Sequence, residues 1–498
     1  MMACRSTAGF ARASTLLASL LLAGCAVGPD FKMPLAPQGA GYMAGTMIPS
    51  TVSTPGMLGE AQHFIPGKEI PDQWWRLFHS RPLNALVERA LAENPTLAAA
   101  RAALRAAREN VLAQEGSLFP SVGLDASDAR IRTATGALAP TSASGAPEYT
   151  LYTGQLNISY AVDVFGLNRR MIESTAAQAE TQRFQMEAAH LTLTTNVVVA
   201  AAREAGLRSE IAAQQDIIKA ESTVTDIVRS QYKLGDVSEA NLLQQEAVLA
   251  QARGLLPPLQ KQLALQHNAL IALVGGFPNE DIAQQFDLSS LRVPRDLPVS
   301  LPSELVAQRP DIRAAAANLH AASAQVGVAI ANRLPKISLS ANAGTAVTTL
   351  ASSVTPTNMF FTMAGGLTQP LFDGGTLLHK EGAAKALFDE ATSQYRATVI
   401  GAFRDVADTL HALQSDAEAL RAAVTAERAA ARSFDTMQQQ LKLGSTSYLY
   451  VLDAERTYEM ARLGLVQAQV MRLADTAALF QALGGGWRES PDLPGDPG

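Results

Sequence analysis

A short sequence occurs twice in this chain, and the repetition constrains the fold more than any other feature. Lys-Leu-Gly occupies positions 233–235 and again 442–444, and each copy is followed by a long stretch with helical periodicity. Other residues also recur in matched positions of the two halves, as Pro120 and Pro335 do. Solenoid repeats have units of about 20–50 residues, so a much longer period indicates a duplicated half-chain.

Each half is expected to contain a strand hairpin followed by helices. In QLNISYAVDV, apolar side chains from Leu156 to Val164 alternate with polar or small ones, which predicts a strand with one apolar and one polar face. Asn94 is a candidate N-cap for a helix from about Pro95 to Leu118. The predicted strand hairpins span about 120–165 and 335–371, and the predicted long helices span about 168–232 and 376–441.

The two predicted long helices are unusual for a globular domain, because sixty-odd residues at ~1.5 Å per residue reach roughly 100 Å. Their apolar residues recur at three- and four-residue spacing with many alanines between them, which favours close packing as in a coiled coil. Lysine is favourable at the C-terminal end of a helix, and Gly235 and Gly444 can adopt the left-handed turn that follows. The sequence therefore predicts two helical hairpins with tips at Gly235-Asp236 and Gly444-Ser445.

The N-terminus has the features of an exported lipoprotein. Arg5 and Arg12 precede the apolar run TLLASLLLA, which is too short to span a bilayer and is typical of a signal sequence. The run ends in Leu-Ala-Gly-Cys25, which resembles the bacterial lipobox, so cleavage would leave Cys25 as the lipidated first residue. Ala26 in the next position favours sorting to the outer membrane. An ordinary signal peptide followed by a chance cysteine is the alternative.

The repeats and the N-terminal signal together divide the chain into segments. The expected segments are a lipoprotein signal peptide at 1–24, a lipidated N-terminal arm at 25–81, a first structural repeat at 82–276, a linker at 277–300, a second structural repeat at 301–486 and a C-terminal tail at 487–498. The expected fold is mainly α-helical, with one strand hairpin and one helical tip in each repeat.

Four strands with one apolar face cannot close a membrane barrel by themselves. The smallest membrane barrels need about 8 strands, and an open sheet edge in lipid would leave backbone groups unsatisfied. We therefore expect an oligomer that pools its strands into one barrel and its helices into a hollow cylinder. A membrane pore that continues into a long helical tube is a conduit.

Several motifs carry a resemblance that extends over nearly the whole mature chain. CAVGPDF follows the lipobox, WWRLF begins at Trp74, RPDIRAA at Arg309, QPLFDGG at Gln369 and LKLGSTSYLYVLDAE at Leu441. Together they resemble the TolC/OprM outer-membrane factor family, most closely its NodT-like lipoprotein branch. The resemblance implies a homotrimer with a shared twelve-stranded β-barrel and a long periplasmic α-helical barrel. It also implies a periplasmic adaptor protein and an inner-membrane pump, usually of the resistance-nodulation-division class.

The expected function is that of the outer-membrane exit duct of a tripartite efflux system, which conducts substrates passively to the exterior. Two alternatives stay open: an outlet for type I protein secretion, and a structural coiled-coil envelope lipoprotein without a pore. The sequence shows no catalytic constellation, metal-ligand spacing or cofactor motif, so a covalent lipid on Cys25 is the only attached group expected. A net charge of −6 argues against a nucleic-acid partner and leaves the outer-membrane lipids as the expected non-protein partner.

Candidate site residues lie at the two helical tips. In the family, carboxylates near the second tip narrow the periplasmic mouth, and the resemblance carries this role to Asp453. Tyr450, three residues earlier, takes a position where some relatives have a further acid. The alternative is that Asp453 is an ordinary solvated side chain.

Adaptor docking is expected at Gly235, Asp236, Gly444 and Ser445. In the first tip, Asp236 and Glu239 could either line the mouth or cap the following helix, and capping is the preferred interpretation.

The lipobox makes a direct prediction. Cys25→Ser should abolish acylation and leave barrel insertion possible, because the strands have their own affinity for the membrane. Mass spectrometry of the mature parent should find an acylated N-terminal Cys25. The same measurement on the variant should find no acyl group. An unmodified mature N-terminus at another residue of the parent would refute the lipobox interpretation.

Overall fold

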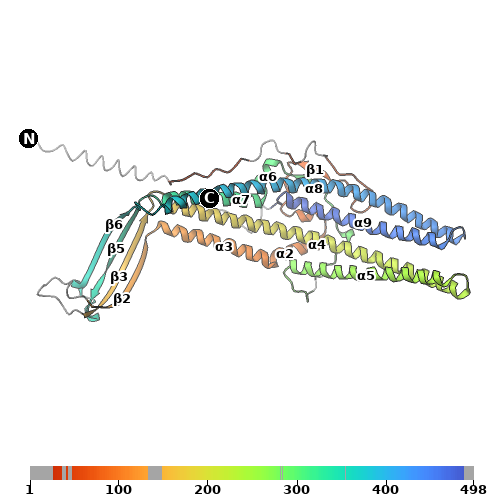
Figure 1. Ribbon diagram of the computed structural model, residues 1–498, viewed down its shortest axis with the longest axis horizontal. Coiled ribbons are helices and arrows are strands. Elements are labelled where there is room, and N and C mark those ends of the chain that lie inside the picture. Colours follow the sequence, from red (N-terminus) through yellow and green to blue (C-terminus); the bar gives the residue numbers. More distant parts are fainter. Residues whose placement is uncertain are drawn as a thin grey trace, which may run out of the picture. The chain divides into compact units, whose positions relative to one another are not determined.

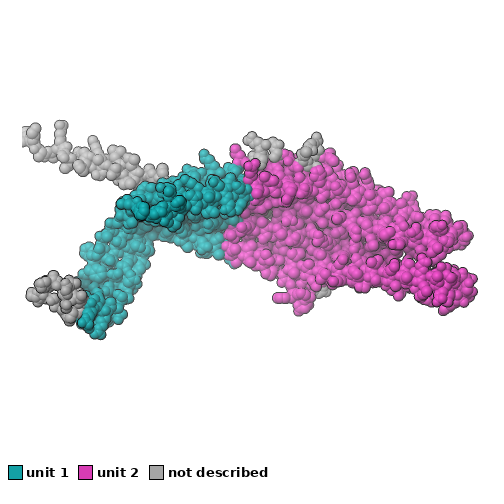
Figure 2. Space-filling model, in the orientation of Figure 1, with its two compact units in different colours: residues 1–34, 104–181, 315–395 teal, residues 35–103, 182–314, 396–498 magenta. Residues whose placement is uncertain are grey.

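The computed structural model describes residues 26–35, 41–42, 48–132, 148–280, 282, 284–353 and 355–486. Cys25 and the C-terminal tail at 487–498 lie outside the described residues. The chain divides into two compact units, shown in two colours in Figure 2. Unit 1 comprises 1–34, 104–181 and 315–395, and unit 2 comprises 35–103, 182–314 and 396–498.

Unit 1 contains a four-stranded antiparallel sheet whose strand order is β2-β3-β5-β6 (Figure 1). The strands are β2 (Ser121–Arg132), β3 (Glu148–Val162), β5 (Lys336–Val347) and β6 (Met359–Thr368). Both predicted hairpins are therefore present, and β3 and β5 join them into one sheet. Strands β2 and β6 form its two edges.

The predicted alternation along the strands is confirmed by their register. One row across the sheet pairs Val122 with Ile158, Ile158 with Ala341 and Ala341 with Met363. We call the face that carries this row, and the parallel row through Leu124, Leu156, Ala343 and Phe361, the apolar face. The opposite face carries Asn157, Asn342 and Thr362, and there Asn157 Nδ2 donates to Asp125 Oδ2. Phe361 and Met363 are each 79% exposed, so the described residues leave the apolar face uncovered there.

Strand β3 ends two residues before the predicted limit at Val164. Asp163 accepts hydrogen bonds from the backbone N–H of Asn168 (3.1 Å) and Arg169 (3.0 Å), so its carboxylate caps the next helix. Because its side chain satisfies donors at the helix start, Asp163 belongs to the turn and not to the strand ladder.

Two very long helices follow the two strand hairpins. They are α4 (Leu167–Leu234) and α8 (Thr376–Lys442), each within two residues of the predicted limits. Each reverses at a glycine with positive φ, Gly235 at 84° and Gly444 at 70°, as expected. The returning helices are α5 (Glu239–Leu273) and α9 (Tyr448–Ala482).

The helices of unit 2 pack through small and polar contacts as well as apolar ones. Gln214 of α4 donates from Nε2 to the carbonyl of Ala252 in α5 (2.8 Å). Gly206 of α4 allows a close approach to α9, since a Cβ there would lie 2.3 Å from Val470 Cγ2. No helix in the described part of the chain is both long enough and apolar enough to cross a membrane.

Among the shorter helices, α3 begins at the cap that the sequence predicted. Asn94 is confirmed as the N-cap of α3, because its Oδ1 accepts from the N–H groups of Thr96 (2.9 Å) and Leu97 (3.1 Å). The remaining helices are α2 (Arg81–Glu93), α3 (Pro95–Glu115), α6 (Pro302–Gln308) and α7 (Pro310–Ala331), with 3-10 turns η1 (Trp74–Phe78), η2 (Gly116–Leu118), η4 (Leu288–Ser290), η5 (Leu350–Ser352) and η6 (Pro356–Asn358).

Unit 2 also contains a small parallel sheet that the sequence did not predict. Strand β1 (His63–Pro66) lies in the expected arm and pairs with β4 (Asp296–Val299) in the expected linker. Beside it, Arg472 of α9 is fully buried and donates to Thr51 Oγ1 (3.3 Å) and to the carbonyl of Glu60 (2.5 Å). These bonds attach the arm at Thr51 and Glu60 to the helical core of unit 2.

Candidate functional site

The two helical tips have the same backbone geometry. At the first, the N–H of Gly235 donates to Tyr232 O and that of Asp236 to Gln231 O, both at 3.0 Å. At the second, Gly444 donates to Leu441 O and Ser445 to Gln440 O, again at 3.0 Å. This pattern satisfies the last carbonyls of a helix and needs a residue with positive φ, which explains the glycine in each tip.

Ser238, and not Asp236 or Glu239, caps the helix after the first tip. Its Oγ accepts from the N–H of Asn241 at 3.3 Å. Asp236 is exposed and takes part in the turn through its N–H, so the preferred capping role for its carboxylate is wrong. Glu239 occupies the first turn of α5, where a negative charge is favourable to the helix dipole.

Tyr450 and Asp453 both lie exposed on the first turns of α9. The Tyr450 side chain is 65% exposed. Asp453 borders a cavity of about 430 Å³ together with Arg456, Glu459 and Glu221. Both side chains are therefore accessible at the surface of the chain.

Three glutamates near the second tip are a feature that the sequence reasoning missed. Glu221 of α4 and Glu455 of α9 are each only 4% exposed, and Glu459 follows Glu455 by one helical turn. We call Glu221, Glu455 and Glu459 the carboxyl cluster. The i, i+4 spacing of Glu455 and Glu459 was visible in the sequence, but their burial depends on which side of α9 meets α4.

Burial perturbs the acidity of the carboxyl cluster. It raises the pKa of Glu455 to about 7, and the charge of Glu221 adds to this effect. Burial also raises the pKa of Glu459 to about 8, with contributions from Glu455 and Glu221. Burial raises the pKa of Glu221 as well, against the opposing effect of its hydrogen bond from Gln245 Nε2 (2.5 Å). Burial thus favours the protonated form of all three carboxyls, in keeping with the cost of burying unpaired charge.

A third region of interest lies in unit 1, directly after the predicted lipidation position. The N–H of Val27 donates to Phe165 O (3.1 Å), and Arg170 Nε of α4 donates to Val27 O (3.0 Å). Arg170 also pairs with Asp30 at 2.9 Å. The residues after Cys25 are thus bound to the first turn of α4, close to the end of β3.

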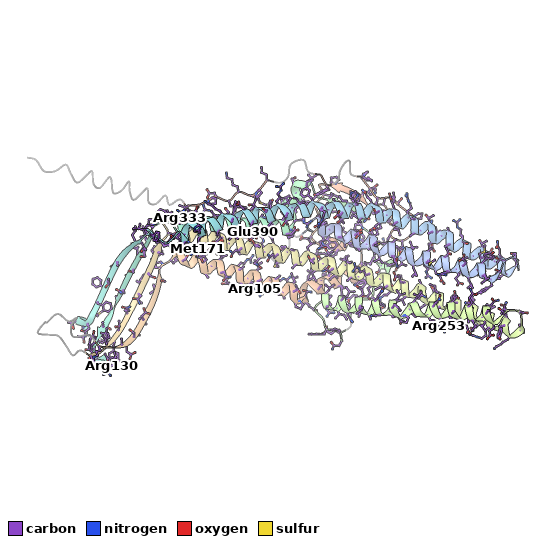
Figure 3. The ribbon with its side chains drawn as sticks, in the orientation of Figure 1. Arg105, Arg130, Met171, Arg253, Arg333 and Glu390 are labelled. Atoms are coloured by element: carbon purple, nitrogen blue, oxygen red, sulfur yellow. The ribbon has the colours of Figure 1, made fainter. Side chains whose placement is uncertain are left out.

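Charged side chains also mark both ends of the strand region of unit 1, as the labels in Figure 3 show. Arg333, just before β5, pairs with Glu381 of α8, which also pairs with Lys385 at 2.7 Å. Arg130, near the far end of β2, pairs with Glu148 of β3 at 3.5 Å. Among the described residues, no group of three or more His, Cys, Asp or Glu side chains is arranged to hold a metal ion.

Comparison with known proteins gives a consistent family match. The family model for the outer membrane efflux protein matches residues 86–276 and 301–485. The chain is 31% identical over 427 residues to the pyoverdine export outer membrane protein OpmQ of Pseudomonas putida, covering 85% of this chain and 90% of that protein. It is 27% identical over 486 residues to the toluene efflux pump outer membrane protein TtgC of another Pseudomonas putida strain, covering 96% of each.

A solved structure of the outer-membrane channel OprN superposes with a TM-score of 0.82 at 26% identity. The match covers 93% of this chain and all of that one.

The cap of the first tip leads to a prediction with a natural control. Ser238→Ala removes the bond to Asn241 N–H and should destabilise the start of α5 by about 1 kcal/mol. Ser447 holds the equivalent position before α9, and within the described residues its hydroxyl makes no cap bond. Hydrogen exchange of the amides at 239–245 should accelerate roughly fivefold in Ser238→Ala. Ser447→Ala should leave exchange at 448–454 near the parent rate, and equal acceleration at both tips would contradict the assignment.

Proposed function

The chain belongs to the outer membrane efflux protein family, and we propose that it is the passive exit duct of a tripartite efflux system. Efflux channels of this family reside in the outer membrane, extend into the periplasm and work with an adaptor and an inner-membrane pump. The relatives OpmQ and TtgC are named for different cargoes, pyoverdine and toluene. We therefore assign substrate selection to the pump and conduction to this chain.

The apolar face of the sheet is the observation that carries this proposal. It presents Val122, Leu124, Phe361 and Met363 to the surroundings, while the opposite face is polar. A sheet with one lipid-compatible face and one hydrated face suits the wall of a membrane pore. Its free edges at β2 and β6 must pair with other strands, because lipid cannot satisfy backbone donors and acceptors.

Three protomers would supply twelve strands, enough to close a barrel whose polar face lines the lumen. We propose a homotrimer in which β6 of one protomer pairs with β2 of the next. Exposed leucines on α5 of unit 2, Leu243, Leu255 and Leu265, support a matching ring of helices, since they leave apolar surface for a neighbouring helix. The helical ring would continue the lumen into the periplasm.

The two tips are proposed to form the periplasmic mouth and its docking surface. Leu234 and Leu443, beside Gly235 and Gly444, are 78% and 82% exposed, which provides apolar surface for the adaptor. The pump is proposed to be of the resistance-nodulation-division class. Cys25 is proposed as the lipid anchor, and the bonds of Arg170 to Val27 and Asp30 support an attachment point at the start of α4.

The proposed barrel predicts opposite outcomes for neighbouring residues of β6. Met363→Lys places a charge on the apolar face and should cost about 2–4 kcal/mol near the bilayer midplane. Thr362→Lys places the same charge on the polar face and should be tolerated. Native mass spectrometry of outer-membrane extracts in mild detergent should show trimers for the parent and Thr362→Lys, and strongly reduced trimer for Met363→Lys. A stable folded monomer of the parent would overturn the channel proposal.

The proposed mouth predicts a change in conductance. Three copies of Tyr450 and Asp453 around the axis would narrow the lumen and attract cations. Tyr450→Ala/Asp453→Ala should therefore raise single-channel conductance in planar bilayers, and Asp453→Ala alone should weaken the cation preference most. Glu69→Ala removes an equal charge from the loop after β1 and should behave like the parent. Unchanged conductance and selectivity in all variants would mean that Asp453 is an ordinary solvated carboxylate.

A further inference from the structure

The carboxyl cluster occupies the contact between α4 and α9, close to the tips and away from any backbone turn. Glu455 and Glu459 lie on α9 and Glu221 lies on α4, all within unit 2. On the same side of α9, the hydroxyl of Tyr448 is buried and has no hydrogen-bond partner among the described residues. Burial raises the pKa of Tyr448, and the charges of Glu221 and Glu455 contribute. Polar groups thus take positions where a helical hairpin would ordinarily bury apolar side chains.

One neighbouring side chain donates a hydrogen bond to the cluster, and little positive charge lies near enough to offset its negative charge. Gln245 of α5 is 2% exposed and donates from Nε2 to Glu221 Oε2, while its Oε1 is buried without a partner among the described residues. The charges that shift the pKa values of Glu455 and Glu459 come from the other carboxylates of the cluster. Ionisation would therefore add repulsion that the surrounding side chains do not offset.

The ionisable groups on the surrounding helices are engaged elsewhere or face the open side of the cavity. Arg462 of α9 pairs with Asp216 of α4 at 3.0 Å. Arg229 of α4 pairs with Glu246 of α5 at 2.9 Å and also with Asp226. Asp453 and Arg456 border the cavity as exposed side chains.

Helix α8 also contacts α9. There Phe434 stacks on Tyr458 with ring centroids 6.1 Å apart. The neighbouring carboxylate Asp435 is exposed and accepts from Gln439. Asp435 is therefore engaged on its own helix.

The cavity gives the cluster a route to solvent. Its volume of about 430 Å³ is large enough for several water molecules, and Glu221 and Glu459 both border it. The remaining lining is largely apolar, with Ile217 and Leu452 among its members. Protons can therefore reach the carboxyl groups although two of the three side chains are almost fully buried.

We propose that Glu221, Glu455 and Glu459 form a proton-sensitive contact that holds α9 against α4 while the carboxyls are neutral and releases it when they ionise. The link to gating rests on the proposed function, because Tyr450 and Asp453 lie on the same first turns of α9. Movement of this part of α9 away from α4 would carry both residues with it. The periplasmic mouth would then change its width with the pH.

The direction of the effect follows from linkage. In the packed state burial raises the pKa of Glu455 to about 7 and that of Glu459 to about 8, whereas a solvated glutamate titrates near 4.3. Between these limits the packed state binds more protons than the separated one, so rising pH weakens the contact. The contact is complete below about pH 4 and is progressively lost as the pH rises through about 7–8. Each ionising carboxyl can shift the ratio of packed to separated states by up to about tenfold per pH unit.

Electron–electron double resonance on the full-length trimer tests this inference. Spin labels at Lys233 and Ser445, both exposed, would report the separation of the two tips, with labelled protomers diluted by unlabelled ones. We expect one short, narrow distance distribution at pH 5.5 and a longer component that grows between pH 7 and 9. The triple variant Glu221→Gln/Glu455→Gln/Glu459→Gln should keep the pH 5.5 distribution throughout, because glutamine resembles the neutral acid.

Two controls separate the possible outcomes. Asp435→Asn removes an exposed carboxylate of α8 and should retain the pH response of the parent. The single variant Glu455→Gln should show a smaller pH-dependent change in distance than the parent. It keeps the inference testable if the triple variant fails to assemble. Distances that do not change from pH 5.5 to 9 in the parent, or an equal response in the glutamine variants, would overturn the inference.

The distance measurement needs no ion conduction, so it separates this inference from the proposed function. A pH-dependent distance in a trimer that does not conduct would refute the duct and leave the proton-sensitive contact standing. A trimer that conducts but whose distances do not change with pH would refute the proton-sensitive contact and leave the duct standing.

Discussion

The unpaired edges of the four-stranded sheet are the constraint on which the rest of the structure depends. Strand β2 and strand β6 each present a row of backbone donors and acceptors beside an exposed apolar face. In water such a sheet would aggregate, and in lipid its edges would be unsatisfied, so one protomer is incomplete in either solvent. Closure with further copies satisfies the edges and exposes only the apolar face to lipid. The proposed oligomer and pore both follow from this single requirement.

The motifs that carry the family resemblance act mainly at helix ends. Arg309 of the RPDI motif donates from Nη1 to Ala482 O (2.9 Å), the last residue of α9, and from Nη2 to Asp311 and Asp405. Asp373 of QPLFDGG accepts from Gly375 N (2.9 Å) and Leu377 N (2.8 Å), and these bonds to the start of α8 lower the pKa of its carboxyl. Helices of more than sixty residues must begin and end at fixed points if their long contacts are to stay in register. These motifs fix those points.

The features that depend on local periodicity could be predicted from the sequence, and those that depend on long-range contacts could not. The long helices and their glycine turns follow from 3.6-residue periodicity and from the need for positive φ at Gly235 and Gly444. The pairing of β1 with β4 was missed because each strand has four residues and the partner is more than two hundred positions away. The cap at Ser238 was missed because the run Gly-Asp-Val-Ser-Glu offers more than one capping residue. The burial of Glu455 was missed because apolar residues are spread around all sides of α9. No local pattern therefore reveals which side meets α4.

The presence of buried acids at this contact is itself informative about the tips. Replacing a buried polar cluster by apolar side chains of similar volume is often neutral or stabilising, so maximal packing stability does not explain Glu221 and Glu455. At the other end of α9, Trp74 stacks on Phe480 with ring centroids 5.0 Å apart, and the buried Arg472 donates hydrogen bonds to Thr51 and Glu60. The buried charge of Arg472 is therefore held by hydrogen bonds to the arm, whereas the charges that act on Glu455 and Glu459 are those of the cluster itself. Under the proposed proton-sensitive contact, this difference lets the tip end of α9 separate from α4 while the end at Arg472 stays attached.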